Sequence, residues 1–348
     1  MRVIVATAQV PFVRGGAELC VEGVRDALIA AGHQAEIAAV PFKWYPPERL
    51  LDAMLACRLL DLSESCGTAI DVVVAMKFPA YYIPHPRKVL WLLHQYRAAY
   101  DLWGNELADL HREPLGSQVK AAIEQADRRF LPEARAIFAD SRRVAARLLD
   151  YCGIASRPLY HPPPNAGLYH GGAARDYFFF PSRLNRAKRQ ELVIQALALT
   201  ECPVEVRFAG EADEPAHAEG LRELARRSGV ESRVRWLGSI SEEEKIELYA
   251  HAAAVLYPTY DEDYGYVTLE AMLASKPVIA CADSGGPLEF VVPEETGLVA
   301  RPDAAALAEA MDRLWDGRAA AARMGCAGRD RYAALDISWD HAIGQLLA

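Results

Sequence analysis

The sequence predicts an α/β protein with two doubly wound parallel sheets, and three observations support this prediction. Apolar runs of strand length alternate with helical patterns, most regularly from residue 177 to residue 252, which is typical of parallel sheets covered by helices. Residues 160–165 (YHPPPN) contain three consecutive prolines, which exclude a helix or a central strand and predict a domain boundary. The chain of 348 residues, 52% of them hydrophobic, is long enough for two cores.

The first elements are a buried strand over residues 2–8, a tight turn at Gly15 and Gly16, and a helix over residues 17–31. The N-terminus of a helix offers free N–H groups to an anion. The turn is therefore either a phosphate or sugar contact or a plain turn. The full GxGxxG fingerprint is missing, so a dehydrogenase is not favoured.

Leucine spacing after two prolines predicts a helix over residues 50–59, and strands follow over 71–75 and 88–93. The second of these strands ends at His94. A histidine at the carboxyl end of a strand can contact a ligand, although a structural role stays open. Beyond it, a short strand at 136–139 and a helix from Arg142 to Tyr151, capped by Ser141, complete the first half.

Composition excludes several classes of function. The net charge of −9 argues against nucleic-acid binding, and the seven scattered cysteines form neither a disulfide framework nor a zinc knuckle. We find no apolar run of about 20 residues and no cleavable signal pattern, so we expect a cytoplasmic protein. The segment 112–157 is locally basic, which fits a solvated helix face or a patch for an anionic lipid or acceptor.

Several loops in the second half carry candidate binding groups. Arg183 and Lys188 lie between a strand and a helix, where two cations can neutralise a diphosphate, although such a pattern is unspecific. Turns that can face a nucleotide follow two further strands, at Gly210 and at Ser239 with Ile240.

The most informative stretch runs from Pro258 to Glu289 and joins two apolar runs that we expect to be neighbouring parallel strands. Seven residues separate Glu262 from Glu270, and a helix is predicted to begin near Tyr266. A carboxylate in such a loop accepts hydrogen bonds from sugar hydroxyls, whereas the helix N-terminus attracts phosphate. The site is completed by two consecutive glycines, Gly285 and Gly286, whose backbone can approach a sugar closely.

Together these motifs resemble retaining glycosyltransferases of family 4. The resemblance is strongest from about 177 to 300, through SRLNRAK, RFAG, RWLGSI, EDYGYVTLE, LEAMLASKPVIA, GGPLEFV and ETGLVARP in this order. It implies the GT-B fold, with two facing Rossmann-like domains and a cleft between them. The expected domains are an acceptor-binding domain over 1–164 and a donor-binding domain over 165–330, and the last helix, about 331–348, packs back on the first domain.

The resemblance also implies a role for each matching position. Arg183 and Lys188 would hold the donor diphosphate, and Glu262 and Glu270 would bind the transferred sugar and the ribose. His94 would face the sugar near the reacting carbon. The remaining donor contacts would come from Gly15 and Gly16, from Ser239 and Ile240 beside the base, from Gly265, Tyr266, Val267 and Thr268 at the phosphates, and from Ser284, Gly285 and Gly286 at the sugar.

The implied reaction is metal-independent hexosyl transfer from a nucleoside-diphosphate sugar, UDP- or GDP-linked, with no cofactor. The acceptor is left open among small molecules, saccharides and lipids, as is peripheral membrane contact through the first domain. Two departures from the family pattern are Arg189, where many members have glycine, and PPPNAGLY at the linker. Two rival hypotheses are a metal site at 261–263 and a GT-B protein that binds sugar nucleotides, or is epimerase-like, without transfer.

Overall fold

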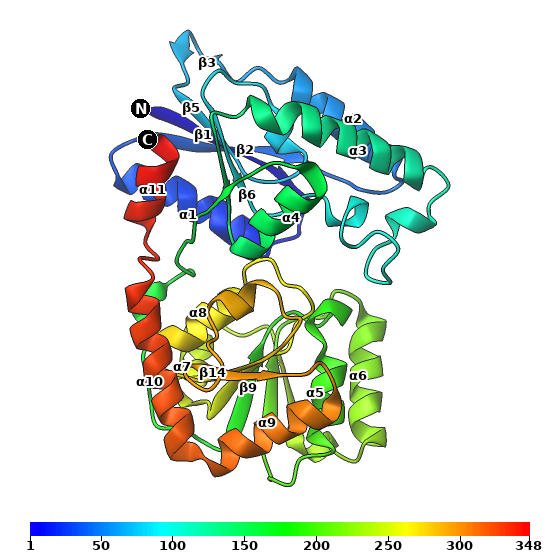
Figure 1. Ribbon diagram of the computed structural model, residues 1–348, viewed down its shortest axis with the longest axis vertical. Helices are drawn as coiled ribbons and strands as arrows, with labels where there is room; N and C mark the ends of the chain where they lie inside the picture. The colour runs from blue at the N-terminus through cyan, green and yellow to red at the C-terminus, as the bar shows by residue number, and fades with distance from the viewer. The chain divides into compact units, whose positions relative to one another are not determined.

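The computed structural model describes all 348 residues, which form two compact units. The first unit contains Met1–Pro164 together with Ile337–Ala348, and the second contains Asn165–Asp336. Each unit is built on a six-stranded sheet whose paired strands are all parallel. The predicted fold class of two doubly wound parallel sheets is therefore confirmed, and Figure 1 shows both sheets with their helices.

In the first unit the strand order is β2-β1-β5-β6-β7-β8. The strands are β1 (Arg2–Gln9), β2 (Gln34–Pro41), β5 (Val72–Ala75), β6 (Lys88–Leu92), β7 (Ala136–Ala139) and β8 (Arg157–Pro158), and a separate hairpin joins β3 (Glu64–Ser65) and β4 (Thr68–Ala69). The α-helices are α1 (Gly16–Ala30), α2 (Glu48–Leu59), α3 (Gly116–Phe130), α4 (Arg142–Cys152) and α11 (Trp339–Leu347).

Two separate apolar clusters cover the two faces of this sheet. One includes residues of α1 and α11, and the other includes residues of α2, α3 and α4. The last helix begins at Ser338, whose hydroxyl accepts a hydrogen bond from the N–H of His341 at 3.2 Å, as expected for a cap. Its Trp339 lies against Gly23 of α1, where a Cβ atom would overlap the indole ring. The glycine therefore permits the close approach of α11 to α1.

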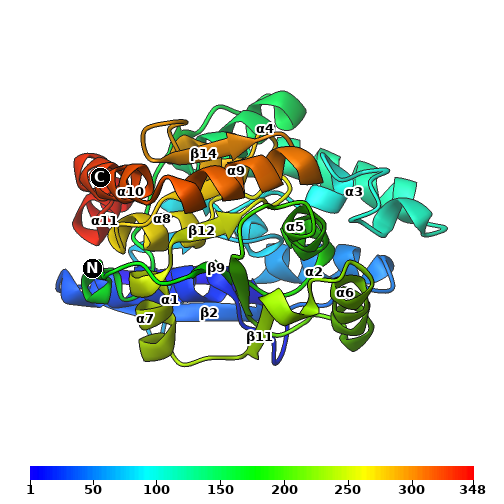
Figure 2. The same cartoon turned by 90° about the horizontal axis from the view of Figure 1, so that it is seen from below.

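In the second unit the strand order is β11-β10-β9-β12-β13-β14. The strands are β9 (Tyr177–Pro181), β10 (Glu205–Ala209), β11 (Val234–Gly238), β12 (Ala254–Tyr257), β13 (Val278–Cys281) and β14 (Gly297–Ala300). The α-helices are α5 (Gln190–Leu197), α6 (Pro215–Arg227), α7 (Glu242–His251), α8 (Tyr266–Leu273), α9 (Ala304–Asp316) and α10 (Arg318–Ala334). Figures 1 and 2 show α5, α6 and α9 on one face of this sheet and α7, α8 and α10 on the other.

This strand order places a topological switch point between β9 and β12, because the chain proceeds outward from β9 in one direction and then returns to begin again at β12. In open α/β sheets the loops at the carboxyl ends of the two strands beside such a point bind ligands. Here those loops contain Arg183 and Lys188 after β9 and Glu262 after β12. The fold thus brings distant parts of the sequence to one edge of the sheet.

One helix differs from its sequence interpretation. The leucine spacing from Leu50 to Leu59 correctly predicts α2, but the helix buries Leu50 and Met54 and leaves Leu55 and Leu59 exposed, at 60% and 75%. The apolar run therefore extends beyond the face that contacts the sheet.

No helix of the structure is both long enough and apolar enough to cross a bilayer.

Candidate active site

The centre of the candidate site is an ion pair between Lys188 and Glu262. The ammonium group of Lys188 donates a hydrogen bond to the Glu262 carboxylate and lies 3.3 Å from the hydroxyl of Tyr257. Both side chains are largely but not fully buried, with exposed fractions of 15% for Lys188 and 24% for Glu262. The two predicted site residues, 74 positions apart in the sequence, are thus in direct contact.

The backbone of the Glu262 loop is joined to the loop after β13. The N–H of Glu262 donates to the carbonyl of Ser284 at 2.9 Å, and the N–H of Gly286 donates to the carbonyl of Glu262 at 2.7 Å. A Cβ atom at Gly285, which has φ of +75°, would lie 2.5 Å from the Glu262 carbonyl oxygen, so glycine is required there. Within 284–286, the N–H groups of Ser284 and Gly286 are both engaged within the protein. Only the N–H of Gly285 is therefore left for a sugar.

Helix α8 begins at Tyr266, as the sequence predicts, after Gly265 with φ of +89°. A side chain at Gly265 would contact the ring of Tyr257 at 2.9 Å, so the glycine also has a packing role. The N–H of Thr268 already donates to the carbonyl of Gly265 at 3.1 Å. The Thr268 hydroxyl is fully buried and has no hydrogen-bond partner in the protein.

Glu270 lies further along α8 and is 6% exposed. Its carboxylate accepts hydrogen bonds from the hydroxyl of Tyr249 at 2.6 Å and from the ammonium of Lys245 at 3.3 Å, both on α7. Burial lowers the pKa of Lys245, but the charge of Glu270 and the contacts with Glu242 outweigh it and raise that pKa overall. Glu270 is therefore held in place by two donors on α7, and sequence analysis missed these two residues.

Arg183 makes a different set of contacts. Its guanidinium donates to Asp213 at 2.8 Å, and 53% of its side chain is exposed. The amide of Asn185 donates to the other oxygen of Asp213 at 2.9 Å. The two cations proposed for the diphosphate therefore have separate acidic partners, Asp213 and Glu262.

Arg189 explains one departure from the family pattern. It has φ of +59° and ψ of +41°, the left-handed region that favours glycine. Its guanidinium donates to both carboxylate oxygens of Asp283, each at 2.7 Å, and lies over the ring of Tyr260 at 5.0 Å. The hydrogen bonds to Asp283 raise the pKa of Arg189, against a smaller opposite effect of burial. The arginine thus joins the loop of Lys188 to the loop that leads to Gly285.

The turn after β11 is held in place by Glu211, whose carboxylate accepts a hydrogen bond from the N–H of Ser239 at 3.0 Å. Beside it is a cavity of about 270 Å³ lined by Gly210, Glu211, Trp236 and Gly238 among others. Neither Ser239 nor Ile240 lines this cavity. The turn nevertheless lies next to it, so the prediction that this turn borders a base stays a prediction.

The remaining candidates, Gly15, Gly16 and His94, belong to the first unit. The N–H of Gly15 donates to the carboxylate of Glu18 at 2.9 Å, and Glu18 also pairs with Lys77 at 2.8 Å. This N–H is therefore occupied, and Gly16 begins α1. The Nδ1 atom of His94 lies 2.6 Å from the carbonyl oxygen of Gln95. Since a carbonyl only accepts, Nδ1 carries a proton and donates this hydrogen bond.

The fold and these contacts define a class: an α/β protein with a cationic and acidic site at the switch point of a Rossmann-like sheet. Residues 173–331 match the family described as glycosyl transferases group 1. The match lies within the second unit, and the resemblance to family 4 glycosyltransferases is confirmed.

Curated relatives match over part of their length. The chain is 38% identical to the alpha-1,3/1,6-mannosyltransferase ALG2 of Mus musculus over 117 residues, which is 34% of this chain and 28% of that relative. It is 32% identical to the D-inositol 3-phosphate glycosyltransferase of Corynebacterium diphtheriae over 48% of this chain and 40% of the relative. The chain thus spans less than half the length of these relatives.

Solved structures match over nearly the whole chain and show the fold. Sucrose-phosphate synthase from Thermosynechococcus elongatus superposes with a TM-score of 0.77 at 20% identity, covering 99% of this chain and 98% of that one. HepE of Anabaena, solved in complex with UDP and glucose, gives a TM-score of 0.74 at 19% identity, with the same coverage of 99% and 98%. The GT-B class is therefore confirmed.

Proposed function

We propose that this protein is a retaining glycosyltransferase that moves a hexose-type sugar from a nucleoside-diphosphate sugar to an acceptor. The observation that carries the proposal is the contact between Lys188 and Glu262 at the switch point of the second sheet, inside the region that matches the family. A cation and a carboxylate in contact suit a ligand that presents both phosphate and hydroxyl groups.

In the proposed reaction the donor exchanges partners with this ion pair. The diphosphate draws the ammonium of Lys188 away from Glu262, and the freed carboxylate accepts hydrogen bonds from hydroxyls of the transferred sugar. Lys188 and Arg183 then stabilise the charge that develops on the diphosphate as the bond to the sugar breaks. Preorganised positive groups lower a barrier most where charge develops in the transition state.

Glu270 is the proposed partner of the ribose. Its carboxylate is fixed by Tyr249 and Lys245, so it needs little reorganisation to accept a hydrogen bond from a ribose hydroxyl. Backbone amides of Tyr266 and Val267 at the start of α8 would contact the phosphates, where the helix dipole favours negative charge.

Residues 1–164, the continuous part of the first unit, form the proposed acceptor-binding domain. We assign His94 to the reacting sugar, and Gly16 rather than Gly15 to any amide contact with the diphosphate, because the N–H of Gly15 is already bonded. Small molecules, saccharides and lipids all remain candidate acceptors, and a cytoplasmic location and membrane contact through this domain stay predictions.

The proposed donor keeps the two bases that the family resemblance implies. The HepE structure holds UDP and glucose, and a mannosyltransferase is among the relatives. We therefore propose a UDP- or GDP-linked hexose. A thermal-shift panel of UDP-, GDP- and ADP-sugars tests this directly, since a ligand that binds only the folded protein stabilises it by mass action. Stabilisation by none of the three would contradict the proposal.

The rival hypotheses give different results in an activity assay. A labelled donor with an acceptor should yield a product with the anomeric configuration of the donor, and EDTA should leave the rate unchanged. Binding without transfer or hydrolysis would favour the non-transferring alternative. A loss of activity in EDTA that manganese restores would favour a metal site at 261–263.

A further inference from the structure

A second cavity lies at the opposite edge of the second sheet from the proposed donor site. It has a volume of about 430 Å³ and is lined by residues that directly precede β12 and β13, by the segment 171–174 and by one side of α10. The donor loops follow the carboxyl ends of the strands, whereas Ala253 and Pro277 lie at their amino ends. Its volume falls within the roughly 300–1,000 Å³ typical of sites for small molecules.

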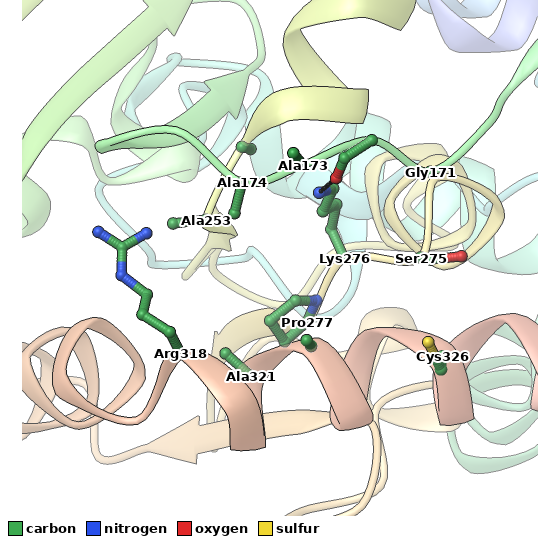
Figure 3. A pocket seen from close by; sticks show the side chains of 13 residues that line it. Gly171, Ala173, Ala174, Ala253, Ser275, Lys276, Pro277, Arg318, Ala321 and Cys326 are labelled. Atoms are coloured by element: carbon green, nitrogen blue, oxygen red, sulfur yellow. Dashed lines mark hydrogen bonds between the residues drawn. The ribbon is translucent and has the colours of Figure 1, made fainter.

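The charge of the cavity wall is positive. Lys276 and Arg318 line it, and none of its lining residues is acidic. The rest of the wall consists mainly of small residues and a free thiol, Cys326. Figure 3 shows Arg318, Ala321 and Cys326 on the α10 side and Lys276 reaching toward the 171–174 segment.

Lys276 is the unusual residue among those that line the cavity. It is 5% exposed, and its ammonium group makes one hydrogen bond, to the carbonyl of Gly172 at 2.8 Å. No carboxylate pairs with it, although buried charges in proteins are normally paired. Burial lowers the pKa of Lys276 to about 8, the direction expected for a desolvated ammonium without a counter-ion. Two of its three N–H donors have no acceptor in the protein.

Arg318 also contributes positive charge to the cavity wall. Its guanidinium donates to Asp176 at 2.9 Å and to the carbonyls of Trp315 and Arg175, and these bonds fix the group beside the cavity. Asp176 itself does not line the cavity. The cavity thus presents a preordered cation and an unpaired buried cation to any occupant.

We propose that this cavity binds a small oxyanion, a phosphate group either free or as the ester of a small metabolite, with Lys276 as its principal partner and Arg318 as the second. A phosphate can accept charge-assisted hydrogen bonds from lysine and arginine side chains, and it would supply the counter-charge that Lys276 lacks. The small side chains of the wall leave room for a compact organic group. The site would lie directly after α8, the helix that carries Glu270.

The test uses Cys326 as a local reporter in the full-length chain with Cys66→Ser, because Cys66 is the other exposed cysteine. Inorganic phosphate should slow the reaction of Cys326 with a thiol reagent and give an apparent Kd. Lys276→Gln keeps a donor for Gly172 but removes the charge, and should raise that Kd about tenfold or more, the size of one lost charge-assisted contact. Lys188→Gln, at the donor site, should leave it unchanged.

Further outcomes of the same assay decide the proposal. Protection by a sugar phosphate at lower concentration than by inorganic phosphate identifies an ester as the ligand, whereas equal protection identifies the free ion. Protection by uncharged glucose alone, or protection that Lys276→Gln leaves intact, overturns the proposal. If Lys276→Gln does not fold, Arg318→Gln replaces it, and a Kd for phosphate that this variant leaves unchanged would also overturn the proposal.

Discussion

The left-handed backbone of Arg189 gives a prediction in which two contributions to the free energy of unfolding oppose each other. Replacing the arginine removes a bidentate ion pair with Asp283, in which the exposed fractions are 22% and 34%. Hydrogen bonds to charged groups contribute about 1.5–3 kcal/mol, and partial exposure places this pair at the lower end. A residue with a Cβ atom costs about 1–2 kcal/mol in this region of φ and ψ, and glycine does not. Arg189→Gly therefore loses the pair but relieves the strain.

The two terms nearly cancel for glycine, whereas alanine loses the ion pair without relieving the strain. We predict that Arg189→Gly changes the free energy of unfolding by less than about 1 kcal/mol, whereas Arg189→Ala, which loses the pair and keeps the strain, destabilises by about 1.5–2 kcal/mol. Asp283→Ala should resemble Arg189→Ala. Urea denaturation monitored by tryptophan fluorescence measures all three variants. An Arg189→Gly protein less stable than Arg189→Ala would refute the strain argument.

Three more predictions follow from other contacts. Lys188→Ala should lower kcat by the equivalent of about 3 kcal/mol of transition-state stabilisation. Turnover is measured with a donor that the thermal-shift panel identifies, and Lys120→Ala on α3 is the matched control. Gly23→Ala should destabilise the protein by about 1–3 kcal/mol in thermal unfolding, because the new methyl group overlaps Trp339. An unchanged Tm would contradict the packing of α11 on α1. Burial raises the pKa of Asp127 to about 6 from its usual 3.8, so the folded state binds this proton more tightly than the unfolded state does. The free energy of unfolding should therefore fall as pH rises from about 4 to 6. Asp127→Asn should flatten this dependence of stability on pH, and an identical dependence in the variant would exclude Asp127 as its source.

Much of the fold could be predicted from the sequence because its signals are local. Apolar runs marked the buried strands on both sides of the switch point, and the three prolines at 162–164 marked the end of the first continuous unit. The start of α8 at Tyr266 was also predictable, since Gly265 breaks the acidic loop just before an apolar helical run.

The contacts inside the site were harder to predict. Tyr249 reaches Glu270 across 21 residues of sequence, and only the packing of α7 beside α8 brings them together. The left-handed conformation of Arg189 could not be read from the sequence, because an arginine carries no signal for it. The exposure of Leu55 and Leu59 shows the same limit, since leucine spacing predicts a helix but not how wide a face its neighbours cover.

The most direct test of the proposed function is the release of nucleoside diphosphate from a sugar donor by the wild type and by Glu262→Gln. This substitution keeps the size of the side chain and removes the charge that contacts Lys188. We predict that the wild type releases the diphosphate and transfers the sugar with retention, and that Glu262→Gln still folds and binds donor but loses about 3 kcal/mol of transition-state stabilisation. Wild-type turnover in Glu262→Gln would contradict the assignment of the site.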